Sequence, residues 1–180
     1  MPINKPNQQA KSTDTMYQFY ISKKKRGRIN LDPEYQREVV WNEDDMSEFI
    51  DSLMKNKVAS ALIFNKSLEG EYVCIDGKQR STSIFNYFKN KFPWNNDGDL
   101  IYYSKIPKGC SGKIMTKEQQ MQFEDKELFW SEYTDLTYEE QVSIFEANHA
   151  GKALSSGEEL LSCFKKKSVA ATIKETASKH

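Results

Sequence analysis

The chain has 180 residues with 26 basic and 26 acidic side chains, so no net positive field draws the whole chain to nucleic acid. Its cysteines (Cys74, Cys110 and Cys163) lack metal-ligand spacing, and His149 and His180 are its only histidines, which excludes a two-His zinc site within it. It has no long apolar run and no apolar leader, so we expect an intracellular protein, in the cytoplasm or nucleus, without a membrane partner.

The first thirty residues are polar and locally basic. Residues 1–13 have few apolar side chains and are predicted to be disordered. Residues 16–21 favour a short amphipathic helix that ends in a basic run, and residues 28–31 favour a short strand. The run is a candidate contact for a DNA backbone, although such a run is more often a solvated helix end. Its basic residues are Lys23, Lys24, Lys25, Arg26 and Arg28.

The most regular helical pattern of the chain covers residues 43–55. Asn42 is a suitable N-cap, and the acidic residues 43–45 follow it in the first turn, where the helix dipole favours negative charge. Apolar residues then recur at helical spacing from Met46 to Met54. Trp41, directly before the cap, is predicted to lie in the core or in a pocket wall.

A strand, a turn and a helix are predicted around residues 72–90. Residues 59–64 and 72–75 form a plausible hairpin. Asp76 and Gly77 suit a tight turn, and a helix follows to about residues 87–90. Lys78, Gln79 and Arg80 stand at its start, where free backbone N–H groups favour an anion. The alternative is a surface turn with solvated charges.

The second half of the chain continues the mixture of helices and strands. We expect loops over 93–98 and 105–112, strands over 100–103 and 128–133, and a helix over 117–123. Thr137 and Glu140 form a capping box for a helix that Gly151 closes, and another helix begins near Ser155. The predicted fold is α+β, a small mixed sheet packed by helices, with one domain over residues 14–165 and the start of a helical region over 166–180.

Three segments of the chain together resemble the N-terminal domain of GmrSD-type restriction endonucleases, within the ParB/sulfiredoxin-like superfamily. The first is Pro-Glu-Tyr-Gln-Arg-Glu-Val-Val-Trp at 33–41, and the second is Asp-Gly-Lys-Gln-Arg at 76–80. The third contains Phe145, Asn148, Gly151, Leu154, Ser155 and Glu158. Lys78 departs from the family's usual Gln. Sulfiredoxins are similar but carry a catalytic Cys, which this chain lacks at the matching positions, so Cys74 is expected to be a buried apolar residue.

The resemblance implies a ParB-like module that binds and hydrolyses an NTP, coupled to DNA recognition or cleavage, with the nuclease centre in a separate domain or subunit. Asp76, Gln79 and Arg80 are then the catalytic candidates, and Asp76 would also hold Mg²⁺. The nucleotide-binding candidates are Tyr35, Gln36, Arg37, Gly77, Lys78, Ser81, Thr82 and Asn148. A structural role competes with this one, because Arg37 and Asp76 could form a buried ion pair that joins the two motif segments.

A second hypothesis has no hydrolysis. In it the basic run, together with Arg37 and Arg80, binds DNA along one groove, and the affinity falls strongly with salt. An NTPase module instead predicts a saturable nucleotide site and modest affinity for DNA.

Overall fold

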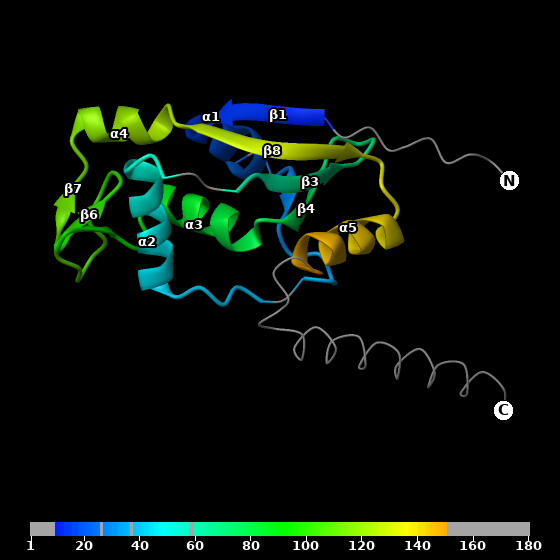
Figure 1. Cartoon of the computed structure of the whole chain (residues 1–180). Helices are drawn as coiled ribbons and strands as arrows, with labels where there is room; N and C mark the ends of the chain where they lie inside the picture. The colour runs from blue at the N-terminus through cyan, green and yellow to red at the C-terminus, as the bar shows by residue number, and fades with distance from the viewer. Residues whose placement is uncertain (1–9, 26, 37, 58–59, 151–180) are drawn as a thin grey trace, which may run out of the picture. The chain divides into compact units, whose positions relative to one another are not determined.

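The computed structural model describes residues 10–25, 27–36, 38–57 and 60–150. It divides the chain into two compact units, residues 1–142 and 143–180. In the first unit a mixed sheet has the strand order β1-β8-β3-β4-β2, which confirms the α+β class (Figure 1). The strands are β1 (Ala10–Thr15), β2 (Ile29–Asn30), β3 (Leu62–Lys66), β4 (Tyr72–Asp76) and β8 (Glu127–Thr134).

The pairing within this sheet explains how distant segments meet. β3 and β4 form the predicted antiparallel hairpin. β2 lies parallel to β4, with Ile29 opposite Tyr72, so the chain leaves both strands toward the same edge of the sheet. β8 is parallel to β3 and antiparallel to β1. Strand β1 includes residues 10–13, for which the sequence predicts disorder. That prediction is wrong there because pairing with β8 supplies backbone partners that the local sequence does not reveal.

Helices follow the predicted order. They are α1 (Met16–Phe19), which continues into the π-helical segment η1 (Tyr20–Lys25), then α2 (Glu43–Met54), α3 (Lys78–Phe88), α4 (Lys117–Glu124) and α5 (Tyr138–Ala150). α2 packs against α3 and runs across the direction of the strands in Figure 1. The predicted closing Gly151 and the helix near Ser155 lie outside the described residues. No helix in the described ranges is long and apolar enough to cross a membrane.

A second sheet has the order β5-β6-β7, from β5 (Trp94–Asn96), β6 (Asp99–Tyr102) and β7 (Lys113–Ile114). The sequence predicts a loop over residues 93–98, and this is wrong for β5. Pro, Asn and Gly are typical of turns, but Trp94 is buried, and its indole Nε1 donates to Asp51 Oδ1 of α2 at 3.1 Å. Tertiary packing therefore overrides the local composition.

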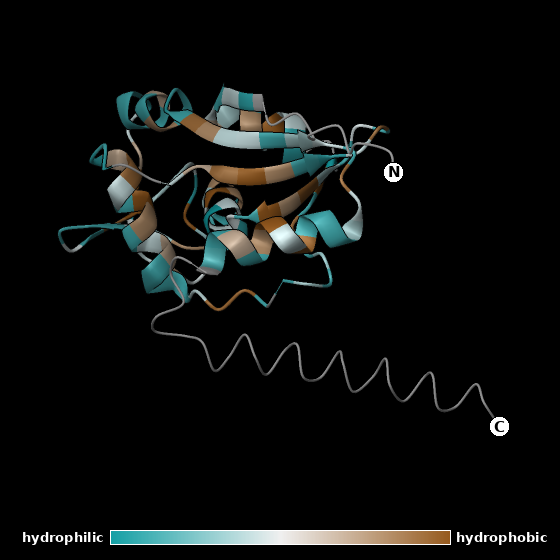
Figure 2. Ribbon diagram, turned by 45° about the vertical axis from the view of Figure 1, so that its right-hand side comes forward, coloured by the Kyte–Doolittle hydropathy of each residue, from teal (hydrophilic) through white to brown (hydrophobic). Residues whose placement is uncertain are grey.

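The core fills the space between the five-stranded sheet and α3. Phe19, Phe64 and Phe85 are buried, and their rings contact one another through Phe19 at centroid distances of 5.4–5.9 Å. Figure 2 shows hydrophobic residues gathered on the central strands and the neighbouring helices. Trp41 is partly buried and packs on Phe49 at 5.7 Å, as the sequence predicts. This packing fixes the rotation of α3 and hence the position of its first turn.

Candidate functional site

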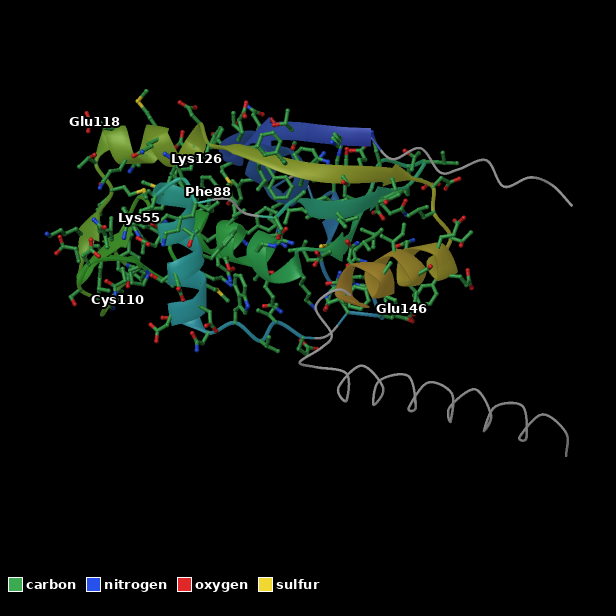
Figure 3. The ribbon with its side chains drawn as sticks, in the orientation of Figure 1. Lys55, Phe88, Cys110, Glu118, Lys126 and Glu146 are labelled. Atoms are coloured by element: carbon green, nitrogen blue, oxygen red, sulfur yellow. The ribbon has the colours of Figure 1, made fainter. Side chains whose placement is uncertain are left out.

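Strand β4 ends in a glycine turn that leads directly into α3. Gly77 has φ +102°, and a Cβ at this position would lie 2.3 Å from Leu62 Cδ2. Both observations require glycine, since other residues rarely adopt this φ and the space is filled. α3 then begins at Lys78, and none of the described side chains caps its N-terminus. Phe88, labelled in Figure 3, lies in the last turn at the other end of this helix.

The other helices of the described chain start differently. In each of them a side-chain oxygen accepts a hydrogen bond from a first-turn backbone N–H. The capping residues are Thr15 for α1, Asn42 for α2, Thr116 for α4 and Thr137 for α5. The predicted capping box of Thr137 and Glu140 is confirmed. The start of α3 therefore differs from the others in keeping its first-turn N–H groups without a side-chain acceptor from the described residues.

The segment at residues 33–41 is held against this turn by amide side chains. Gln36 Nε2 donates to the carbonyl oxygens of Cys74 and Ile75, at 2.7 and 2.8 Å. Gln79 works in the opposite direction: its Oε1 accepts from the backbone N–H groups of Val40 and Trp41, and its Nε2 donates to the Glu38 carbonyl. The two predicted motif segments thus meet in space. Their glutamines bond to backbone, which is a positioning role that the sequence does not predict.

Tyr35 extends the same contact zone. Its hydroxyl lies 3.2 Å from Gln141 Oε1 on α5 and 3.5 Å from the Cys74 carbonyl oxygen. Burial raises the pKa of Tyr35 above its usual range, so the hydroxyl is protonated and serves as a donor. Burial also raises the pKa of the Cys74 thiol to about 12, in line with the predicted inert role. Arg37 lies outside the described residues.

Arg80 is almost fully enclosed, with 12% of its side chain exposed. Its Nη1 donates to the Ser60 carbonyl, to Ser60 Oγ at 2.8 Å and to the Ala61 carbonyl at 3.3 Å. Its Nη2 lies 3.3 Å from Asp76 Oδ2. Burial lowers the pKa of Arg80, and the Asp76 charge acts against this shift. Asp76 therefore forms an ion pair with Arg80 at the turn, and Arg80 also ties the turn to the segment before β3. The predicted pair of Asp76 with Arg37 falls on a residue outside the described ranges.

Lys78 and Asp32 form a second ion pair at the same edge of the sheet. Asp32 follows β2, and its backbone N–H donates to Asn30 Oδ1 at 2.8 Å. Lys78 Nζ donates to Asp32 Oδ1; the lysine side chain is 8% exposed and the aspartate side chain 72%. Ser81 is fully buried and its hydroxyl has no hydrogen-bond partner among the described residues, whereas Thr82 is half-buried.

The basic run lies at the other end of β4. Lys23 is buried, with Nζ 3.4 Å from the ring centroid of Tyr72, the first residue of that strand. Burial lowers the pKa of Lys23, and the neighbouring Glu132 acts in the opposite direction. Lys24 Nζ lies 5.8 Å from the Phe85 ring centroid, and Arg28 is exposed. Lys25 ends η1, and Arg26 is outside the described residues. In the described part of the run, Lys23 and Lys24 lie against Tyr72 and Phe85, and not at the β4–α3 turn.

Asn148 and His149 lie on the part of α5 that belongs to the second unit. Asn148 Nδ2 donates to the Ile144 carbonyl at 3.1 Å, and His149 Nδ1 lies 2.8 Å from the Phe145 carbonyl oxygen. Both are contacts one helical turn back. Within the described ranges, no group of three or more His, Cys, Asp or Glu side chains is arranged to hold a metal ion.

Comparison with known protein families shows the family to which the chain belongs. A family model described as the N-terminal domain of the GmrSD restriction endonuclease matches residues 17–175, which is most of the sequence. The chain belongs to this family. No curated protein and no solved structure gives a significant match. Membership places this GmrSD N-terminal domain in a family that processes DNA, which the resemblance of the three motif segments predicts.

The sequence does not identify two residues of the site, Asp32 and Ser60. Asp32 precedes a proline and is a residue type typical of turns, and Ser60 lies in a predicted strand. Asp32 is 46 positions before its partner Lys78 in the sequence, and Ser60 is 20 positions before its partner Arg80. The parallel pairing of β2 with β4 would have pointed to Asp32, because the carboxyl ends of parallel strands share an edge where ligands bind.

Proposed function

We propose that this GmrSD N-terminal domain binds and hydrolyses a nucleoside triphosphate, with the phosphates at the β4–α3 turn, as a module of a DNA restriction or processing protein. The observation that carries the proposal is the start of α3. It follows a glycine turn at the carboxyl end of β4, to which β2 runs parallel, has no side-chain cap from the described residues, and carries Lys78 at its first position. Such a helix end attracts phosphate through its N–H groups and its dipole.

The roles at the turn follow from the contacts. Lys78 and the first-turn N–H groups would bind phosphate oxygens. Arg80 contributes its charge nearby, but its hydrogen bonds and its ion pair go to Ser60, Ala61 and Asp76, so we assign it to holding the turn in shape. Gln36 and Gln79 join the motif segments at the site.

Magnesium fits this site only as an ion carried by the nucleotide. Mg²⁺ in such sites takes one or two protein carboxylates and completes its shell with phosphate oxygens and water. Asp76 is the carboxylate at the turn, and Arg80 lies beside one of its oxygens. Asp76 is therefore our candidate for the single protein ligand and for orienting the attacking water, with Gln79 as its neighbour.

Two titrations at two salt concentrations test the proposal. Fluorescently labelled ATP and GTP are titrated into the protein with Mg²⁺, and labelled duplex DNA is titrated in parallel. We expect saturable nucleotide binding at both salt concentrations and a slow release of inorganic phosphate. Salt-sensitive DNA binding without any nucleotide binding would instead support the DNA-binding hypothesis.

A further inference from the structure

The ion pair between Lys78 and Asp32 is unequal in its exposure to water. The ammonium of Lys78 is enclosed, with 8% of its side chain exposed, whereas the Asp32 side chain is 72% exposed. The carboxylate therefore meets the lysine from the solvent side. It can leave this contact without unpacking any buried group, because the Asp32 backbone is held separately by Asn30 Oδ1.

A second feature at the start of α3 is an unused polar group. Ser81 lies one turn into the helix and is fully buried, and its hydroxyl has no partner among the described residues. Its own N–H already donates to the Gly77 carbonyl. The Cα–Cβ bonds of a helix tilt toward its N-terminus, which for Ser81 is the Gly77 end of α3. Buried hydroxyls normally have partners, and an acceptor oxygen of a ligand would supply one.

We propose that the Asp32 carboxylate occupies the position of a phosphate group at Lys78, and that the polyphosphate chain of a nucleotide displaces it on binding. This inference rests on the proposed function and adds its regulation. A carboxylate carries one negative charge and a terminal phosphate nearly two, so the ligand is the stronger partner for a lysine at a helix N-terminus. Asp32 is thus a built-in competitor that lowers the affinity for every anion at this turn.

The test compares Asp32→Asn with Asp99→Asn. Asp99 also pairs with a lysine, Lys113 at 2.7 Å, but this pair is exposed and belongs to the second sheet. Both variants remove one carboxylate from a lysine partner. Inorganic tripolyphosphate and labelled ATP are titrated calorimetrically and by fluorescence. We expect Asp32→Asn to bind both ligands about tenfold more tightly than the wild-type protein, because the negative charge of Asp32 no longer repels the phosphate groups. We expect Asp99→Asn to bind them as the wild type does.

A double variant and melting curves complete the design. Adding Lys78→Gln to Asp32→Asn should remove the gain in affinity. Tripolyphosphate should raise the melting temperature of Asp32→Asn more than that of Asp99→Asn, since the anion puts back the negative charge that the substitution removes beside Lys78. If the wild type binds the ligands and Asp32→Asn binds them no more tightly, the inference is overturned and the proposed function stands. The inference is also overturned if the higher affinity of Asp32→Asn persists when Lys78→Gln is added. If no variant binds tripolyphosphate or ATP, the proposed function fails, and the inference fails with it.

Discussion

The starts of α2 and α3 solve the same chemical problem in opposite ways. At α2, Asn42 Oδ1 accepts from the Asp45 N–H at 2.9 Å, and Asp45 Oδ2 accepts from the Asn42 N–H at 3.0 Å. Three acidic residues fill its first turn. At α3 a glycine stands in the cap position, no acidic residue lies in the first turn, and Lys78 is the first helical residue.

The difference indicates what each helix end does. The capping box of α2 satisfies the N–H groups within the chain and surrounds them with negative charge, so this end stabilises the helix and repels anions. The N-terminus of α3 lacks this capping box. Hydrogen bonds to other segments hold it instead, chiefly those of the Arg80 and Gln79 side chains. A helix start that tertiary contacts stabilise can leave its N–H groups for a ligand.

Replacing the turn glycine should have the largest effect on stability. Gly77→Ala places a Cβ 2.3 Å from Leu62 Cδ2 at a φ of +102°. Backbone strain and overpacking together should lower the free energy of unfolding by about 3–5 kcal/mol. Urea unfolding followed by circular dichroism measures this. Gly70→Ala is the control, because Gly70 also has a positive φ, but no heavy atom would lie within 4 Å of its Cβ. Equal losses in the two variants would show that strain alone is at work.

Arg80 should come next. Arg80→Ala leaves Asp76 and the Ser60 and Ala61 carbonyls without their partner in a nearly enclosed site, at an expected cost of about 2–4 kcal/mol. Arg80→Lys should recover only part of it, since an ammonium cannot span the same acceptors. A variant that melts like the wild type but no longer binds ATP would reverse this assignment and make Arg80 a direct phosphate ligand.

Gln36 allows a local measurement at the same turn. Burial raises the pKa of Cys74 to about 12, so at pH 8 this thiol reacts only when β4 opens. Gln36→Ala removes the donor to the Cys74 and Ile75 carbonyls and should destabilise this region by roughly 1–2 kcal/mol. The labelling rate of Cys74 should therefore rise about tenfold in a background without Cys110 and Cys163. An unchanged rate would mean that Gln36 does not hold the strand.

Asn42→Ala at the other helix start should have the smallest effect. Loss of one N-cap costs about 1 kcal/mol, and the site at α3 is not involved. Nucleotide affinity should stay at the wild-type value while the melting temperature falls slightly. A change in affinity here would break the contrast between the two helix ends.

Elements that depend on local sequence could be predicted, whereas elements that depend on distant partners could not. Asn42, the acidic first turn and the apolar spacing predict α2 locally, and the apolar run before Asp76 and Gly77 predicts β4 and its turn. Strands β5 and β1 could not be predicted, because their residues favour turns or disorder and only pairing with β6 and β8 makes them strands.

For the site, the sequence predicts the turn at residues 76–80 and the motif segment at 33–41. It does not predict which groups their side chains bind. Gln36 and Gln79 bond to backbone, and Arg80 bonds to Ser60, which lies in another part of the chain. Such contacts depend on how β3, β4 and the segment at 33–41 come together, and no local pattern encodes them.

The binding of ATP to two lysine variants shows whether Lys78 holds phosphate. Labelled ATP is titrated into the wild-type protein, Lys78→Met and Lys113→Met; each variant removes a lysine that pairs with an aspartate, but only Lys78 lies at the start of α3. Melting curves first show that all three proteins are folded. We then expect saturable binding to the wild type and to Lys113→Met, and at least about tenfold weaker binding to Lys78→Met. Equal affinity in all three proteins, or no saturable binding to any of them, would contradict it.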